Sequence, residues 1–168
     1  QRLASLYPGS PEALDAAGRV EHYAGNFSRA VRTFGQAVQS LRTAPRPPLA
    51  HARVLAMAGR AHQDNGRSDL AMPQYEEAAR LCPRCAEPHY RMGLVHDENQ
   101  RSGDAIASLR RAKSLDPKMK EVYYDLGSVL ERASRISEAA AAYRTYLSLN
   151  PPKELADAAK EALDNLGQ

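Results

Sequence analysis

Apolar residues recur three or four positions apart along most of the chain, which is the spacing of one face of an α-helix. Leu109, Ala112 and Leu115 form one such run. Dipeptides that favour turns, such as Asn65-Gly66, lie between the runs. The pattern predicts an all-α protein built from short helices that are joined by tight turns.

Three columns of small or turn-forming residues repeat with a period of 34. They are Gly59, Gly93 and Gly127; Ala71, Ala105 and Ala139; and Pro83, Pro117 and Pro151. Gly18 and Ala30 each lie 41 positions before the next member of their column, one period plus seven, and we assign the extra residues to a proline-rich insertion at 45–51. Self-similarity at a fixed period predicts stacked structural units that share one core.

Glycine at the eighth position of a 34-residue unit, alanine at the twentieth and proline at the thirty-second resemble the tetratricopeptide repeat. The resemblance implies a right-handed solenoid of tandem antiparallel helix-turn-helix repeats, a TPR-like superhelix. It divides the chain into the end of a preceding repeat (1–10), repeats at 11–44, 52–85, 86–119 and 120–153 around the insertion, and a C-terminal capping helix (154–168). Leu3 and Leu6 match the tail of a preceding second helix, so we expect the natural protein to continue upstream.

The repeated glycine and alanine columns are expected to let the two helices of each unit approach closely. Ser10 predicts a helix N-cap, followed by Pro11 in the first turn and by the acidic Glu12 near the positive end of the helix. Tyr146 departs from the pattern, because the other repeats have alanine in its column. We therefore expect the local geometry around Tyr146 to differ.

The resemblance implies a protein-interaction module, an adaptor or scaffold that binds a partner peptide or domain in a concave groove lined by the first helix of each repeat. The groove positions most typical of binding are Arg19, His22, Tyr23, Arg53, Met57, Arg60, Tyr90, Arg91, Leu94, Tyr124 and Ser128. Two alternatives are a structural scaffold that self-associates through the ends of its repeat array and the targeting domain of a larger enzyme.

Other function classes find little support in the residues. The net charge is +3, and no cluster of Lys and Arg interleaved with aromatic residues marks a nucleic-acid track. No apolar run approaches the roughly 18 residues of a membrane span, so we expect no membrane insertion. Because a glycine-rich phosphate loop, an HExxH motif and a serine nucleophile elbow are all missing, we predict neither an enzyme nor a cofactor.

The one motif that suggests chemistry is the Cys-Pro-Arg-Cys sequence from Cys82 to Cys85. Two thiolates with His89 nearby fall short of the four ligands of a structural zinc site, so no metal is predicted. A disulfide between Cys82 and Cys85 needs an oxidising compartment, and two free thiols are the other alternative. The sequence favours the cytoplasm, whereas an oxidised pair would indicate the periplasm.

Overall fold

The computed structural model describes residues 9–43 and 48–167. The chain divides into two compact units, Gln1–Arg84 and Cys85–Gln168. The helices described in the first unit are α2 (Pro11–Tyr23), α3 (Phe27–Thr43), α4 (Pro48–Asp64) and α5 (Ser68–Leu81); those of the second are α6 (Ala86–Glu98), α7 (Ser102–Leu115), α8 (Lys120–Arg132), α9 (Ile136–Ser148) and α10 (Lys153–Asn165).

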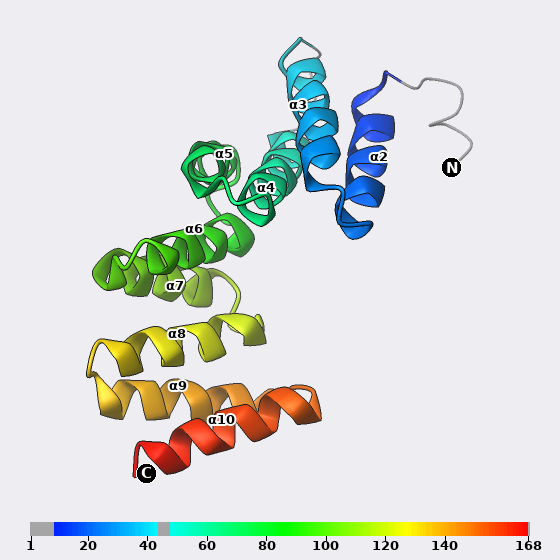
Figure 1. Ribbon diagram of the computed structural model, residues 1–168. Helices are drawn as coiled ribbons and strands as arrows, with labels where there is room; N and C mark the ends of the chain where they lie inside the picture. Colours follow the sequence, from blue (N-terminus) through cyan, green and yellow to red (C-terminus); the bar gives the residue numbers. More distant parts are fainter. Residues whose placement is uncertain (1–8, 44–47, 168) are drawn as a thin grey trace. The chain divides into compact units, whose positions relative to one another are not determined.

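Within each unit the helices follow one another as antiparallel hairpins (Figure 1). In the first unit α2 packs on α3, α3 on α4 and α4 on α5. In the second unit each helix from α6 to α10 likewise packs on the next. The predicted fold class, an all-α array of helical hairpins, is confirmed. The predicted helix tail around Leu3 and Leu6 lies outside the described residues.

The glycine column lies where the two helices of a hairpin touch. A Cβ atom added at Gly18 would lie 2.8 Å from Cε1 of Phe34. The corresponding atoms would lie 2.6 Å apart at Gly59 and Tyr75 and 2.7 Å apart at Gly127 and Tyr143, and a Cβ at Gly93 would lie 2.7 Å from Cγ of Leu109. Since optimal carbon contacts are about 3.5–4.0 Å, each glycine leaves room for the large side chain sixteen residues later.

The seven extra residues of the first repeat lengthen two helices rather than one loop. α3 has 17 residues against 14 in α5 and α7, and α4 has 17 against 13 in α6 and α8. α4 begins at Pro48, so residues 48–51 of the predicted insertion are helical. Proline fits there, because the first helical position needs no backbone N–H partner. The remainder of the insertion, 45–47, lies outside the described residues.

A capping residue and residues with left-handed backbone explain where one helix begins and where the chain turns between helices. The hydroxyl of Ser10 accepts a hydrogen bond from the backbone N–H of Ala13 at 3.2 Å, which confirms the predicted N-cap. The turns inside the first two hairpins contain Gly25 and Gly66, with φ of 76° and 73°. The equivalent residues of the next two hairpins, Gln100 and Ser134, adopt the same left-handed backbone at φ of 59° and 58°. Glycine is favoured at such a position, and a side chain there is strained.

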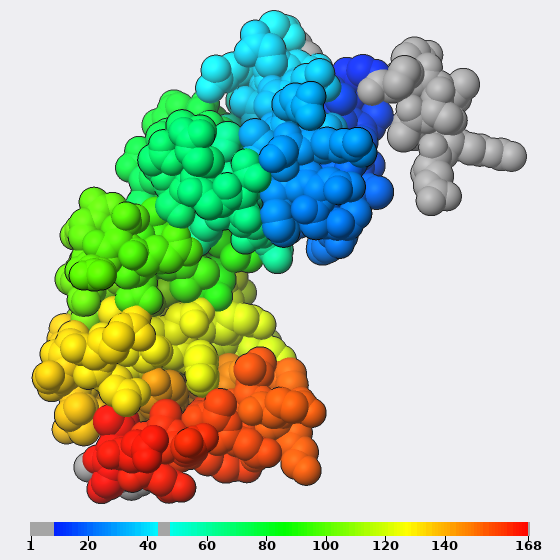
Figure 2. All heavy atoms as spheres, viewed as in Figure 1, coloured from blue at the N-terminus to red at the C-terminus, as the bar shows by residue number. Residues whose placement is uncertain are grey.

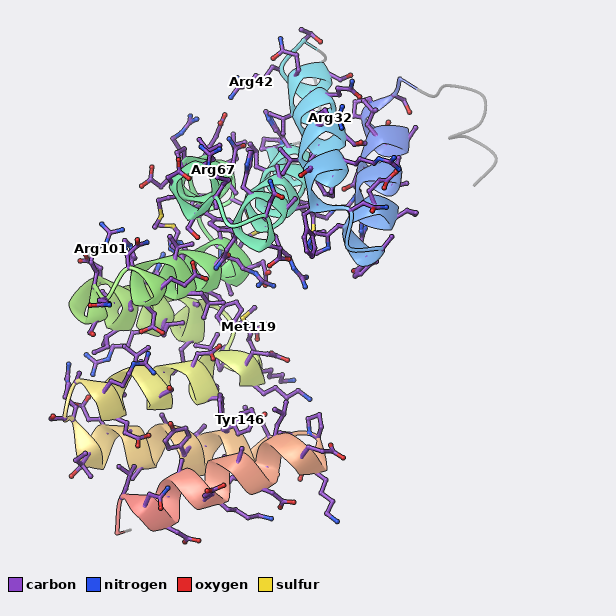
Figure 3. The ribbon with its side chains drawn as sticks, in the orientation of Figure 1. Arg32, Arg42, Arg67, Arg101, Met119 and Tyr146 are labelled. Carbon is purple, nitrogen blue, oxygen red and sulfur yellow. The ribbon has the colours of Figure 1, made fainter. Side chains whose placement is uncertain are left out.

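The C-terminal helix α10 packs against α9, and α8 to α10 form one continuous surface in the space-filling view (Figure 2). Ala159 and Leu163 are buried against the core, whereas Leu155 in the first turn is 48% exposed. Tyr146 is buried between these elements, with its ring centroid 5.3 Å from that of Tyr124 (Figure 3). The expected local departure at Tyr146 is therefore an aromatic contact.

Candidate partner-binding surfaces

The first helices of neighbouring repeats touch within each unit, α2 with α4 and α6 with α8. Side chains from the predicted groove positions bridge both pairs. In the first unit Nη2 of Arg53 lies 3.4 Å from Oδ2 of Asp15. In the second unit the Tyr90 hydroxyl donates to Oδ2 of Asp125 at 2.8 Å. Each unit therefore has a polar surface built by its first helices, which we call the α2/α4 face and the α6/α8 face.

A buried carboxylate organises two arginines on the α2/α4 face. The Asp15 side chain is only 8% exposed, and its Oδ2 also lies 3.9 Å from Nη1 of Arg19. The side chains of Arg19 and Arg53 are 43% and 66% exposed. The Oδ1 atom of Asp15 is buried without a hydrogen-bond partner among the described residues. Two cations therefore share one carboxylate, and guanidinium N–H groups remain available to solvent or to a ligand.

A second polar group on the α2/α4 face is centred on Asp64. Oδ2 of Asp64 lies 2.6 Å from Nε2 of His22 and 3.6 Å from Nε of Arg60. His22 is buried and packs edge-on against the rings of Tyr23 and Phe27, with centroids 5.8 and 5.5 Å away. His22 thus fixes the end of α2 against α4, and Arg60 lies half-exposed beside it.

The remaining predicted residues of the α2/α4 face differ in accessibility. Tyr23 is 71% exposed and offers an aromatic ring to solvent. Met57 is half-buried and packs against the core of the first unit. Tyr23 therefore fits a contact with a partner better than Met57 does.

On the α6/α8 face, Tyr90 is more buried than the repeat pattern predicts for a groove position. Tyr90 is buried in the core and bonded to Asp125. Burial raises the pKa of Asp125 above its ordinary value, although the hydrogen bond from Tyr90 opposes the shift. Burial and the neighbouring Asp125 charge likewise raise the pKa of the Tyr90 hydroxyl. The Tyr90 side chain supports this face from beneath.

The other predicted positions of this face are also held by neighbours. Arg91 bonds Glu87 at 2.7 Å, and its guanidinium carbon lies 5.3 Å from the centroid of the Tyr90 ring. Ser128 accepts a hydrogen bond from Arg132 at 2.7 Å.

Two further positions are apolar. Leu94 and Tyr124 are partly buried against the core, with Tyr124 also 5.7 Å from the ring centroid of Tyr143. The α6/α8 face therefore presents partly buried side chains that already contact their neighbours.

The cysteines end one helix and precede another. Cys82 follows α5 and Cys85 precedes α6, and both are disulfide-bonded in the structure. The oxidation state in the protein's own compartment stays a prediction. Within 9–43 and 48–167, no group of three or more His, Cys, Asp or Glu residues could hold a metal ion. In the same ranges no helix is long and apolar enough to cross a membrane.

The family model described as "Tetratricopeptide repeat" matches residues 16–84, 56–120 and 90–166. The matches overlap and together span nearly all of the chain. The chain belongs to the tetratricopeptide repeat family. No curated protein matches it closely enough to count as a relative.

Solved structures of tetratricopeptide repeat proteins share the fold. MamA from Desulfovibrio magneticus RS-1 is 23% identical, with a TM-score of 0.73 over 87% of this chain and 78% of that one. PilF from Pseudomonas aeruginosa is 20% identical, with a TM-score of 0.78 over 93% of this chain and 67% of that one. YrrB, described as a TPR protein with an unusual peptide-binding site, is 19% identical, with a TM-score of 0.71 over 94% and 78%. At these identities the similarity shows the fold alone.

Sequence reasoning missed the part that Asp15 and Asp64 play. Both occupy groove positions, but their roles depend on contacts with α4 and α2 that repeat spacing alone does not reveal. The local signals are an arginine four residues after Asp15 and another four residues before Asp64, because such pairs meet on a helix surface.

Proposed function

We propose that the chain is a protein-interaction module that binds an extended segment of a partner protein on the α2/α4 face. The observation that carries the proposal is the arrangement around Asp15, where one buried carboxylate pairs with two arginines on neighbouring helices, Arg19 at 43% and Arg53 at 66% side-chain exposure. Because Asp15 attracts both guanidinium groups before a partner arrives, less side-chain entropy is lost when they bind.

The chemistry of this face suits a partner with main-chain or side-chain carbonyl oxygens. Arg19 and Arg53 supply N–H donors, and Tyr23, 71% exposed, supplies a large rigid contact surface. Tyrosine and arginine are enriched at the energetic centres of interfaces. Binding of this kind is stoichiometric, as in an adaptor or scaffold.

The test compares partner capture by the wild type and by a Tyr23→Ala/Arg53→Gln variant from a lysate of the source organism. Glutamine keeps a donor near Asp15, so the variant leaves no buried carboxylate without a neighbour. We expect the variant to lose a protein that the wild type retains, as identified by mass spectrometry. A matched control, Arg32→Gln/Leu70→Ala, changes exposed side chains of α3 and α5 and should retain it.

Two results would contradict the proposal. One is an unchanged set of retained proteins when both variants keep the circular dichroism of the wild type. The other is retention of the chain itself and nothing else, which would favour the self-associating scaffold.

A further inference from the structure

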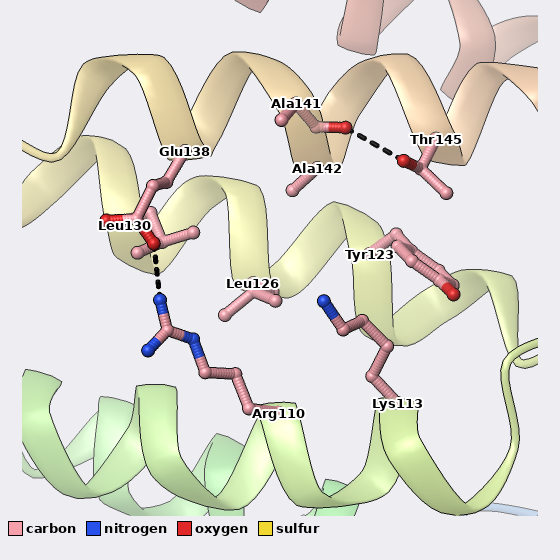
Figure 4. A pocket seen from close by; sticks show the side chains of 9 residues that line it. All are labelled: Arg110, Lys113, Tyr123, Leu126, Leu130, Glu138, Ala141, Ala142 and Thr145. Carbon is pink, nitrogen blue, oxygen red and sulfur yellow. Dashed lines mark hydrogen bonds and ion pairs between the residues drawn. The ribbon is translucent and has the colours of Figure 1, made fainter.

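A separate cavity lies within the second unit, among α7, α8 and α9, and has a volume of about 180 Å³ (Figure 4). Arg110 and Lys113 come from α7, Leu126 and Leu130 from α8, and Ala142 from α9. Its lining includes none of the predicted groove residues. The cavity is therefore a different surface from the α6/α8 face, and binding there is independent of the function proposed for the α2/α4 face.

The size of the cavity limits what it can hold. Small-molecule sites generally start at about 300 Å³. A volume of about 180 Å³ is smaller, so it suits one or two side chains of a macromolecule rather than a whole cofactor. Leu126 and Leu130 are 3% and 2% exposed and form an apolar floor, with Ala142 at 7% beside them.

Positive charge exceeds negative charge around this floor. Arg110 bonds Glu138, and the same carboxylate accepts from Nε of Arg135 at 2.7 Å. Glu138 is therefore shared by two guanidinium groups. The Lys113 ammonium points into the cavity between Leu126 and Tyr123 (Figure 4) and forms no ion pair within the described ranges.

A carboxylate that entered this cavity would have a cation to bind. The leucine side chains beside the Lys113 ammonium offer it neither a hydrogen-bond acceptor nor an opposite charge. An anion bound nearby would supply both. The hydroxyl of Thr145 donates to the carbonyl of Ala141 at 2.9 Å, and the Tyr123 hydroxyl donates to the carbonyl of Pro117 at 3.0 Å. Both donors are already used, so Lys113 and Arg110 determine the charge preference of the cavity.

We propose that this cavity is a second docking site, which binds an acidic segment of a partner protein by taking a carboxylate side chain against Lys113 and an adjacent small apolar side chain against Leu126 and Ala142. Charge complementarity and the apolar floor together select this occupant. A nucleic-acid backbone would match the cations but not the floor, and single-stranded nucleic acid binds largely by stacking on exposed aromatic rings. Tyr123, the aromatic residue of the lining, is 8% exposed.

The experiment selects a phage-displayed library of random peptides on the immobilised full chain, in parallel with the Lys113→Glu variant. The control is Lys153→Glu, the same change at an exposed lysine of α10 outside the cavity. We expect the wild type and the control to enrich peptides that place Asp or Glu beside a small apolar residue. Synthesised peptides should bind Lys113→Glu at least about tenfold more weakly, since reversing one charge of a close pair commonly costs more than 1.4 kcal/mol.

The location of binding is checked by amide chemical shifts in NMR spectra of the full chain. Perturbations at Ala141, Ala142 and Thr145 support the proposal. Perturbations confined to α6 and to the groove positions Tyr124 and Ser128 of α8 overturn it. Enrichment that is equal for wild type and Lys113→Glu, or no enrichment, also overturns it. So does binding of a labelled oligothymidine that Lys113→Glu abolishes when no acidic peptide is enriched, because that result assigns the cations to nucleic acid.

Discussion

Replacing Gly18 by alanine tests whether the glycine column is set by close helix packing. The added methyl group would lie 2.8 Å from Cε1 and 2.9 Å from Cδ1 of Phe34. Phe34 is fully buried, so its ring cannot swing into solvent. Restoring ordinary contact requires a shift of roughly 0.7 Å or more, and such overpacking typically costs about 1–3 kcal/mol.

An opposing effect has to be separated from this cost. Alanine is favoured over glycine in a helix interior by about 0.5–1 kcal/mol. Gly35 provides the control, because it lies inside α3 of the same unit and a Cβ there meets nothing within 4 Å. Gly35→Ala should therefore raise the free energy of unfolding by about 0.5–1 kcal/mol, and Gly18→Ala should lower it by about 1 kcal/mol.

The assay is urea denaturation followed by far-ultraviolet circular dichroism, combined with native-state hydrogen exchange of the amides in α2 and α3. Hydrogen exchange is needed because repeat arrays can unfold in parts, and then one midpoint does not define one free energy. The difference between the two variants isolates the steric cost, since the helix preference is common to both. If Gly18→Ala stabilises the chain as much as Gly35→Ala does, the close-packing argument is refuted.

Five further substitutions, at three kinds of position, have defined outcomes. The raised pKa of Asp125 means that the folded chain binds a proton at this carboxyl more tightly than the unfolded chain does, so the contribution of Asp125 to stability falls as pH rises above 3.8. Asp125→Asn should therefore be more stable than the wild type near neutral pH. In urea titrations this difference should shrink towards about pH 3. Gln100→Gly should raise the melting temperature by relieving about 1 kcal/mol of left-handed strain, whereas Gly66→Gln at the equivalent turn should lower it. Pro73 lies inside α5 and removes a helix hydrogen bond, so Pro73→Ala should stabilise the chain by about 1–3 kcal/mol. Ala107→Pro, at the equivalent position of α7, should destabilise the chain. Urea denaturation measures both effects.

The hairpin arrangement could be predicted from the sequence because its determinants are local or periodic. The contact of Gly18 with Phe34 has a counterpart in every repeat, because the two helices of each repeat approach closely at the same positions. Ser10 could be assigned as an N-cap because its hydroxyl bonds a backbone N–H only three residues away. Such features depend on spacing within one unit, and spacing is visible in a single chain.

For the candidate surfaces, the sequence predicts which positions belong to them but not which of their side chains are exposed. Tyr90 is expected at a groove because tyrosine is frequent at interfaces, yet its hydroxyl bonds Asp125 and its ring is buried. Whether a tyrosine at this position lies inward depends on the acceptor that the next repeat supplies 35 residues later, which the repeat pattern does not determine. The insertion shows a related difficulty: Pro48 follows other prolines and so indicates a loop, although proline is equally compatible with the first turn of α4, where it lies.

The two first-helix faces show how one repeated scaffold can present different chemistry. On the α2/α4 face a buried carboxylate, Asp15, pairs with two arginines whose side chains are 43% and 66% exposed. On the α6/α8 face a carboxylate at a neighbouring position, Asp125, accepts instead from a buried tyrosine hydroxyl, that of Tyr90. The stacking columns are similar in both units, so this difference comes from the variable positions alone. Substitutions at Arg19 and Arg53 should therefore change which partner is bound, whereas substitutions at Gly18 should change the stability of the unit.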